Sequence, residues 1–428
     1  MFKDYIQKKL EKSVQDYFVA HPDVKLICVG GSVGKTSTKL AIATILSEQY
    51  RVRLHEGNHN TALSAPLAIL GIEYPGEIKS IRAWLAVFKA IKQRIKNPSD
   101  VDVIIQELGT DRPGDIAEFG RYLTPDIAVI TGITPEHMEN FITLDAVAQE
   151  ELSLANFSKM VIINRDDTPE QYAQLVSNPN IDTYGTSGLS EYGFVSEDFS
   201  VENGHKGTFT GAEFQEGLDG RATLHVLGEH NIRPIIGAVV VALRFGMAGV
   251  AIQKAAESIR PVSGRMNVLK GVRDSIIIDD TYNSSPAAAA MALQTLVNLP
   301  APQHIAVLGS MNELGQTSAV EHDTLGRMCR PETLDWVITI GDEAERYLAP
   351  AAKANGCAVR SFRDAISAGA YLNKVLETGG IALIKGSEGG IFAEEAVKIV
   401  LHSTDDEAKL VRQTPVWLEA KTRFFSRF

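Results

Sequence analysis

Two kinds of hydrophobic pattern alternate along most of the chain. Residues 2–20 carry apolar side chains at helical spacing with Lys and Glu between them, which predicts an amphipathic helix. Continuous apolar runs predict buried strands, because parallel strands covered on both faces have no polar face. These runs lie at 25–30, 101–108, 126–133, 160–166, 275–282, 304–310, 336–341 and 381–387. The alternation predicts an α/β fold with parallel sheets flanked by helices.

Two segments interrupt this alternation. Residues 185–225 are rich in Gly, Ser, Thr and Phe, and they predict a small antiparallel excursion. The segment "RPVSGR" at 260–265 separates two α/β halves. We therefore expect an N-terminal helix or linker at 1–24, a central domain at 25–259 and a C-terminal domain at 260–428.

Composition narrows the class of protein. The chain has 428 residues and a formal net charge of −11, which argues against sequence-independent binding of nucleic acid. Its three cysteines are far apart, so no disulfide framework or zinc site is expected. The longest apolar run, 235–243, is too short to cross a bilayer, and the charged N-terminus lacks the apolar core of a signal peptide. These features predict a soluble, cytoplasmic protein with no transmembrane segment.

The segment "CVGGSVGKTSTK" at 28–39 has the features of a phosphate-binding loop. It follows a predicted strand, opens a predicted helix and places Gly34, Lys35 and Thr36 at the turn. Glycine permits close backbone approach, N–H groups at a helix start face an anion, and lysine and hydroxyl groups serve phosphate and Mg²⁺. The loop is shorter than the general G-x-x-x-x-G-K-[ST] pattern, because Val29 stands where the first glycine is expected. The alternative is a plain glycine turn before a helix.

The shortened loop resembles that of the Mur ligases, G-[ST]-x-G-K-T, and further motifs of that family follow in order. "GNHNTALSAPLAILG" (57–71) resembles its asparagine-rich segment, with Asn58 and Asn60 at the two asparagines. "IIQELGTDRPGDIAEFGRYLTPDIAVITGITPEHMENF" resembles its strand-Glu-x-Gly and Pro-x-His segments, and "LGEHNIRPIIGAVVVAL" its Gly-x-His-Asn helix start. "SGRMNVLKG", "IIIDDTYNSSPAAAAMAL", "VLGSMNELG", His322 and "IKGS" resemble its C-terminal domain. Within the family the similarity is greatest to the D-alanyl-D-alanine-adding ligases of peptidoglycan synthesis.

The resemblance implies a fold, a reaction and cofactors. The fold would be a P-loop, parallel-sheet ATP-binding domain followed by a Rossmann-like C-terminal ligase domain, with a hinge between them. The enzyme would use ATP and Mg²⁺ to activate a carboxylate as an acyl phosphate, from which an amine displaces phosphate to form an amide. The implied substrates are a small-molecule carboxylate and an amine, such as a muramyl-peptide precursor and a dipeptide.

The resemblance also assigns nucleotide contacts to both predicted domains. In the central domain these are Gly31, Ser32, Gly34, Lys35, Thr36, Ser37, Asn60 and Asn231. In the C-terminal domain they are Arg265, Asp280, Tyr282 and Asn283. Asn231 corresponds to an adenine-side asparagine, with a helix N-cap as the alternative. Arg265 corresponds to an arginine that reaches the phosphates, and the alternative for Asp280 is a strand-end turn acid.

Mg²⁺ ligands and catalytic residues follow from the same motifs. The implied metal ligands are Thr36, Glu107, His137 and Glu151. The implied catalytic residues are Lys35, His137, Glu151 and Arg265. Glu107 ends a predicted strand, from which its carboxylate would reach an ion at the loop. A solvated strand-end glutamate and a polar surface histidine are the alternatives for Glu107 and His137.

Three departures from the family pattern change the expectations. The family's carbamylated lysine, in S-L-x-x-V-A-x-x-K, aligns with Glu151 of "TLDAVAQEE", so a carboxylate replaces the carbamate and its reach is about 4 Å shorter. Glu151 would then hold the second Mg²⁺ through a water molecule, or directly if the backbone lies closer to the ion. The alternative is that Glu151 is a solvated helix residue. The adjacent Glu150 is expected to point in another direction from the helix. Only about 24 residues precede the first strand, so the family's N-terminal UDP-binding domain is expected to be missing. Glu388 and Pro234 replace residues of the family pattern. We therefore expect the residues that bind ATP to be preserved and those that bind the acceptor substrate to be altered.

Two other functions stay open. One is the synthetase subunit of a two-protein amidating system, although the scattered cysteines give no sign of the zinc insertion that such relatives carry. The other is a nucleotide-dependent switch that has lost ligation, which Arg265 and Asp280 disfavour. A protein partner that replaces the missing recognition domain is also open. The tail "VWLEAKTRFFSRF" (416–428) predicts a frayed, partly docked terminus, with a membrane or partner contact as the alternative.

Overall fold

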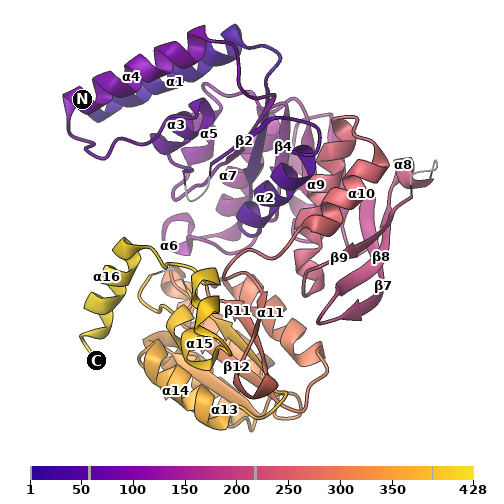
Figure 1. Cartoon of the computed structure of the whole chain (residues 1–428), viewed down its shortest axis with the longest axis vertical. Coiled ribbons are helices and arrows are strands. Elements are labelled where there is room, and N and C mark those ends of the chain that lie inside the picture. The colour runs from indigo at the N-terminus through magenta and orange to yellow at the C-terminus, as the bar shows by residue number, and fades with distance from the viewer. Residues whose placement is uncertain (1, 56–58, 216–218, 388) are drawn as a thin grey trace. The chain divides into compact units, whose positions relative to one another are not determined.

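The computed structural model describes residues 2–55, 59–215, 219–387 and 389–428. They divide into two compact units, of which the first comprises 1–134, 140–225 and 229–259, and the second 135–139, 226–228 and 260–428. The division after Ile259 falls at the "RPVSGR" segment. The α/β fold class is confirmed, since each unit contains one mostly parallel sheet with helices packed on it (Figure 1).

The sheet of the first unit has nine strands in the order β2-β3-β1-β4-β5-β6-β7-β8-β9. The strands are β1 Lys25–Gly30, β2 Val52–Leu54, β3 Val103–Glu107, β4 Ile127–Ile130, β5 Val161–Asn164, β6 Ile181–Gly185, β7 Tyr192–Ser200, β8 Gly204–Thr210 and β9 Arg221–Leu224. The pairings from β2 to β7 are parallel, whereas β7, β8 and β9 pair antiparallel. The predicted antiparallel excursion is therefore present, and it extends the same sheet.

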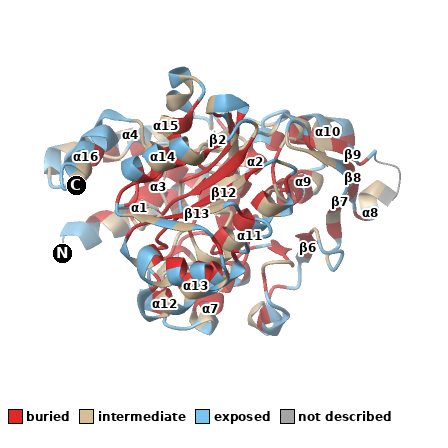
Figure 2. Ribbon diagram, turned by 90° about the horizontal axis from the view of Figure 1, so that it is seen from below, coloured by how far each residue is buried: buried red, intermediate tan, exposed pale blue. Residues whose placement is uncertain are grey.

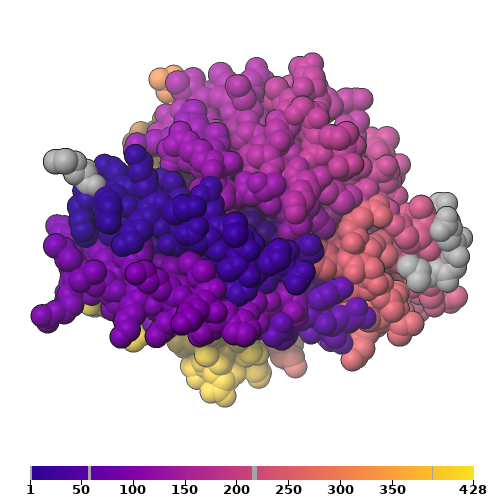
Figure 3. All heavy atoms as spheres, turned by 90° about the horizontal axis from the view of Figure 1, so that it is seen from above, coloured from indigo at the N-terminus to yellow at the C-terminus, as the bar shows by residue number. Residues whose placement is uncertain are grey.

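The helices of the first unit begin with α1, which precedes the first strand, and the others lie between or after the strands along the chain. They are α1 Phe2–Ala20, α2 Lys35–Leu46, α3 Ser64–Leu70, α4 Ile81–Lys96, α5 Asp115–Phe119, α7 Leu144–Asn156, α8 Ala212–Gln215, α9 Arg233–Arg244 and α10 Gly249–Ser258, with α6 Met138–Phe141 at a crossing between the units. Helices α1 and α4 lie side by side (Figures 1 and 3), and the Lys9 ammonium lies 3.9 Å from the centre of the Phe88 ring. The helix predicted at 2–20 is thus a packed part of this unit, with Ile6, Leu10 and Val14 buried.

The sheet of the second unit has six strands in the order β10-β11-β15-β12-β13-β14. The strands are β10 Asn267–Lys270, β11 Ile276–Asp280, β12 His304–Gly309, β13 Trp336–Ile340, β14 Val359–Phe362 and β15 Ile381–Lys385. All pairings are parallel except that of β10 with β11. The helices are α11 Pro286–Asn298, α12 Ser318–Met328, α13 Ala349–Ala354, α14 Ala365–Val375, α15 Glu394–Val400 and α16 Pro415–Phe425.

Apolar strands form the cores of both units, and Figure 2 shows strands buried beneath helices whose outer faces are exposed. In β1 every residue after Lys25 is buried, as a strand between β3 and β4 requires. In the second unit, Ile305, Ile338 and Ile384 pack with residues of α14 and α15. Within the described ranges, no helix combines the length and apolar character needed to span a membrane.

The C-terminal tail was predicted to be frayed and partly docked. Residues 415–425 form helix α16, so the frayed part of this prediction is wrong. The docked part is confirmed, because most of the helix is exposed while its Lys421 is only 3% exposed. The Lys421 ammonium lies 2.9 Å from a carboxylate oxygen of Glu394 and 2.7 Å from one of Glu395. The basic pattern of the tail thus includes a lysine that pairs with carboxylates inside the protein.

Candidate active site

The phosphate-binding loop lies where three parallel strands end. Val29 of β1 is paired with Glu107 of β3 on one side and with Val129 of β4 on the other. Ligands of open parallel sheets bind at the carboxyl ends of such strands. Gly31 has a φ of 115° and Gly34 a φ of 82°, both in the region that favours glycine. Gly34 is also the N-cap of α2, so the loop presents backbone N–H groups at a helix start, where an anion is stabilised.

Ser32 joins the loop to the chain that follows β4. Its backbone N–H donates to the carbonyl of Gly132 at 2.8 Å, and its hydroxyl accepts the N–H of Thr134 at 3.1 Å. Ser32 is 6% exposed. Ser32 therefore holds the loop against the segment after β4. The sequence pattern did not distinguish this structural role from direct contact with phosphate.

Three side chains in the first turn of α2 carry the predicted phosphate and metal chemistry. Lys35 directs its ammonium at the carbonyls of Gly31 and Ser32, the latter 3.3 Å away. The Thr36 hydroxyl donates to a carboxylate oxygen of Glu107 at 3.3 Å, and Ser37 is half-buried in the same turn. The structure therefore brings Lys35, Thr36 and Glu107 together at one end of the sheet.

Glu107 has a second partner that the sequence analysis missed. The ammonium of Lys39 lies 2.9 Å from the same carboxylate oxygen, and both side chains are at most 7% exposed. Lys39 comes four residues after Lys35 and so lies on the same side of α2. A lysine inside an apolar helix pattern was the available signal, because a buried lysine requires an anionic partner.

Thr36 and Glu107 are the residues that would hold a first Mg²⁺. Mg²⁺ usually takes one or two carboxylates together with substrate phosphates and water, so a hydroxyl and a carboxylate beside a phosphate-binding loop fit it. Among the described residues, no three His, Cys, Asp or Glu side chains converge on one point. The donor set thus suits an ion that comes with its nucleotide rather than an ion held by protein alone.

Asn60 of the predicted asparagine-rich segment lies against Gly109 of the strand-Glu-x-Gly segment. A methyl group added at Gly109 would lie 2.4 Å from the side-chain nitrogen of Asn60. Glycine therefore lets the Asn60 side chain take this position, and any larger residue at 109 would force that side chain to shift. The side-chain amide of Gln106 also donates to the carbonyl of His59 at 2.8 Å. The two motifs therefore form one structure at the end of β3, while Asn58 lies outside the described residues.

Glu151, aligned with the carbamylated lysine, lies directly behind the loop. Its carboxylate accepts the backbone N–H of Gly31 at 2.7 Å, and the residue is 1% exposed. The alternative of a solvated helix residue is therefore wrong. The neighbouring Glu150 accepts N–H groups of Gly114 at 2.7 Å and Ile116 at 2.6 Å, so it points toward α5, as expected.

His137 belongs to the second unit and pairs there with two glutamates. Its Nδ1 lies 2.8 Å from a carboxylate oxygen of Glu313, and its Nε2 lies 3.5 Å from one of Glu136. Hydrogen bonds to Glu136 and Glu313 raise the pKa of His137 to about 10. A histidine must lose its proton to bind a metal. The raised pKa favours the protonated form of His137 in this arrangement, and its predicted metal-ligand role stays a prediction.

Asn231 ends a short 3₁₀ turn, Glu229–Asn231, just before α9. Its side-chain amide lies 3.2 Å from Nε2 of His230. The N-cap position of α9 is Ile232, and no side chain caps this helix. The N-cap alternative for Asn231 is therefore wrong, and Pro234 occupies the first turn of the helix, where proline is tolerated.

In the second unit, two neighbouring aspartates at the end of β11 hold the loop that contains Arg265. Asp279 is fully buried, and its carboxylate accepts the N–H of Gly264 at 3.0 Å and the hydroxyl of Thr281 at 2.6 Å. Burial raises the pKa of Asp279 to about 6. The carboxylate of Asp280 accepts the N–H of Met266 at 3.2 Å and pairs with Lys385 at 2.6 Å. Asp280 thus has the structural role of a strand-end acid, and its predicted nucleotide contact stays a prediction.

Arg265 and Tyr282 face each other beside these aspartates. The guanidinium carbon of Arg265 lies 4.4 Å from the centre of the Tyr282 ring, a cation–π distance. The N–H of Tyr282 donates to the carbonyl of Gly264 at 3.0 Å, which links the two loops. Lys385, buried at 2% exposure, donates to the carbonyl of Asn283 at 2.9 Å. The structure therefore joins Asp280 and Asn283 through Lys385, with Arg265 stacked on the neighbouring Tyr282. The sequence analysis did not identify this role of Lys385 in "IKGS".

Comparisons with known proteins agree with this arrangement of domains. The Mur ligase middle domain matches residues 29–242, and the Mur ligase glutamate ligase domain matches residues 264–388. Glu388, one of the predicted departures, lies outside the described residues.

Two similar curated relatives share one description. The UDP-N-acetylmuramoyl-tripeptide–D-alanyl-D-alanine ligase of Bacillus subtilis is 28% identical over 320 residues, which cover 74% of this chain and 63% of the relative. The ligase of the same description from Synechocystis is 27% identical over 369 residues, covering 85% of this chain and 72% of that relative. The chain therefore spans about two thirds of the length of these relatives.

Solved structures show the same fold. MurF from Acinetobacter baumannii superposes with a TM-score of 0.74 at 21% identity, covering 91% of this chain and 79% of that one. MurF ligase from Thermotoga maritima in complex with ADP has a TM-score of 0.72 at 22% identity, covering 94% and 83%. With both domain models matched in order over its two units, the chain belongs to the Mur ligase family.

Proposed function

We propose that this chain is an ATP- and Mg²⁺-dependent ligase that joins a carboxylate to an amine through an acyl phosphate. The observation that carries the proposal is the phosphate-binding loop with Lys35, Thr36 and the buried Glu107 at one strand end. The match of the second unit to a ligase domain supports amide-bond formation rather than simple hydrolysis.

Each of the predicted site residues would have a distinct role in such a reaction. The backbone N–H groups of the loop and the ammonium of Lys35 bind the phosphates of ATP, and Arg265 supplies charge to the transferring phosphoryl group. Mg²⁺, held by Thr36 and Glu107, would offset the negative charge of the triphosphate. Attack of a substrate carboxylate oxygen on the γ-phosphorus then breaks the bond to ADP and forms an acyl phosphate. An amine nitrogen attacks the acyl carbon, phosphate leaves, and the amine loses a proton as the amide forms.

The substrates that we propose are peptidoglycan precursors. The curated relatives are described as ligases of a UDP-muramoyl tripeptide and D-alanyl-D-alanine, which is an acid and a peptide amine. Pro234 departs from the family pattern, so the acid and the amine of this chain need not be those of the relatives, and they are to be identified. A partner protein would supply substrate recognition if the chain alone does not. Because the reaction consumes ATP, we propose that it takes place in the cytoplasm.

The test is ADP release with defined substrates. The purified chain is incubated with ATP, Mg²⁺, a panel of muramyl-peptide carboxylates and a panel of amino acids and dipeptides. Release that requires both an acid and an amine, with an amide product detected by mass, supports ligation. ADP release with neither substrate identifies a nucleotide switch. Amidation that appears only with a copurifying glutaminase identifies the subunit of a two-protein system, and either result removes the proposal.

We expect the activity to be independent of dissolved carbon dioxide, because Glu151 carries its carboxylate without carbamylation. The rate in degassed, bicarbonate-free buffer should equal the rate with added bicarbonate. Glu151→Gln removes the charge behind the loop and should raise the Mg²⁺ concentration needed for half-maximal rate by about tenfold, as loss of a supporting group does. Initial rates across a Mg²⁺ titration measure both effects.

The matched control is Glu150→Gln, the adjacent buried carboxylate that binds α5 instead of the loop. It should lower thermal stability and leave the Mg²⁺ titration unchanged. A Glu151→Gln variant with the wild-type rate at limiting Mg²⁺ would show that the alignment of Glu151 with the metal site is wrong. Stimulation of the wild type by bicarbonate would show the same.

A further inference from the structure

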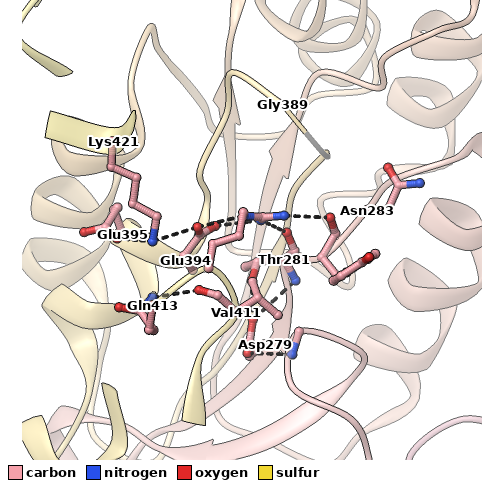
Figure 4. A network of polar contacts seen from close by, with 12 residues as sticks. Asp279, Thr281, Asn283, Gly389, Glu394, Glu395, Val411, Gln413 and Lys421 are labelled. Atoms are coloured by element: carbon pink, nitrogen blue, oxygen red, sulfur yellow. Dashed lines mark hydrogen bonds and ion pairs between the residues drawn. The ribbon is translucent and has the colours of Figure 1, made fainter. Parts of the chain in front are cut away.

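The segment after α15 forms a buried ion network with Glu394 at its centre (Figure 4). Glu394 is fully buried, and its two carboxylate oxygens are bound by Arg412, at 2.9 Å from Nε and 2.8 Å from a terminal nitrogen. Lys421 of α16 lies 2.9 Å from the same carboxylate. All three residues follow residue 388, where the ligase-domain match ends. The network is therefore formed by a part of the chain that the family model does not describe.

Arg412 has a second set of contacts, and these lie in the candidate site. Its guanidinium donates to the carbonyl of Thr281 at 2.6 Å and to the carbonyl of Tyr282 at 3.1 Å. These carbonyls belong to the segment that leaves β11 and carries Tyr282 and Asn283. A planar guanidinium presents five N–H donors in a fixed fork, so one arginine can hold a carboxylate and two carbonyls together.

The residue before Arg412 packs against the loop that holds Arg265. A methyl group added at Gly264 would lie 2.7 Å from a methyl carbon of Val411 and 3.0 Å from the backbone nitrogen of Tyr282. Arg412 itself has a φ of 56°, a backbone conformation that residues other than glycine rarely adopt. Val411 therefore lies directly against Gly264, which is also close to Tyr282, and the backbone turns sharply at Arg412.

A role in stability alone does not account for these contacts. Buried ion pairs contribute little net stability, because removing two charges from water costs about as much as their attraction returns. Glu394 already has Lys421 as a cationic partner. Arg412 binds both carboxylate oxygens of Glu394, and beyond this ion pair it also donates to the carbonyls of Thr281 and Tyr282.

We propose that Arg412 is a positioning residue, which holds the Thr281–Asn283 segment so that Tyr282 meets Arg265 as the reaction requires. The inference rests on the proposed function, since Arg265 is assigned there to the transferring phosphoryl group. The 411–421 segment is then part of the ligase site, acting through backbone carbonyls rather than by touching substrate.

The test compares two variants of the same ion network in the full chain. Arg412→Lys keeps the positive charge beside Glu394 but cannot reach the carboxylate and both carbonyls at once. Lys421→Met is the matched control, because it removes the other cation at Glu394 and leaves the Thr281–Asn283 segment untouched; Glu395 keeps Lys398, 2.9 Å away. We expect Arg412→Lys to lower kcat/KM for ATP about tenfold, while Lys421→Met changes kcat/KM less than about twofold at an equal or lower melting temperature.

A second measurement does not depend on activity. Hydrogen exchange of the backbone amides in 281–285 should be at least about tenfold faster in Arg412→Lys than in Lys421→Met, because the carbonyl contacts that order the segment are lost. Equal exchange and equal kinetics in the two variants would overturn the inference. If the wild type fails to ligate any substrate pair, the proposed function fails, whereas the exchange comparison still decides whether Arg412 positions the segment.

Discussion

Lys35→Ala is expected to lower the rate of ATP turnover by a factor on the order of 10² to 10³, as removal of a charge partner of a transferring phosphoryl group does. The fold should persist, because Lys35 is only partly buried and its ammonium donates to carbonyls of the loop rather than packing in the core. Steady-state ADP release and a thermal melt of the same preparation measure the two effects. The melt should be close to that of the wild type in the absence of ATP.

The control for this variant is Lys89→Ala, which removes an exposed lysine of α4 in the same unit. It should leave turnover unchanged. The wild type should gain thermal stability on addition of ATP and Mg²⁺, because a ligand stabilises the folded state that binds it, and Lys35→Ala should lose much of that gain. A folded Lys35→Ala protein with unchanged turnover would contradict the assignment of residues 31–36 as the phosphate-binding loop.

Arg265→Ala is expected to lower turnover by a factor on the order of 10² or more, with little change in melting temperature. Arg265 lies on the face of Tyr282 and is only half-buried, so its removal leaves no large cavity. Arg265→Lys keeps a charge without the flat guanidinium that stacks on a ring, so it should recover only part of the rate. Single-turnover measurement of acyl-phosphate formation distinguishes loss of this step from slow product release.

The matched control is Arg330→Ala, an exposed arginine of the same unit. It should change neither rate nor stability. Tyr282→Leu removes the ring beneath the guanidinium and should show part of the Arg265→Ala defect, whereas Tyr282→Phe should not. An Arg265→Ala protein that melts far below the wild type, with full activity in its folded fraction, would mean that Arg265 serves the fold and not the reaction.

The strands and the phosphate loop were predictable because their signals are local. Each of the eight predicted apolar runs contains a strand of the structure, since a strand buried on both faces must be apolar along its whole length. The strands that were not predicted, β2, β6, β10 and β14, are three to five residues long, and most of their residues are only partly buried or exposed. A short strand of this kind has no continuous apolar run and forms through its neighbours.

The partners of charged residues were much less predictable. Lys39 with Glu107, Lys385 with Asp280, and Arg412 with Glu394 are pairs that join distant parts of the sequence or different elements. Charge pairing depends on distances in the folded chain, which hydrophobic periodicity does not encode. His137 shows the same limit, because its motif suggested a metal ligand but did not indicate that Glu136 and Glu313 lie beside it and raise its pKa. Motif resemblance thus proposed positions for the site, whereas the charged partners of these residues became visible only in the fold.

The contact between Asn60 and Gly109 has a consequence for how this protein can vary. A side chain added at Gly109 would overlap the Asn60 side chain where it now lies, so Asn60 would have to move away from the end of β3. An alanine at Gly109 should therefore be tolerated better after residue 60 has become smaller, so the order of the two changes matters. Two motifs that are distant in sequence thus form a single unit of epistasis, and each limits the mutations that the other can accept.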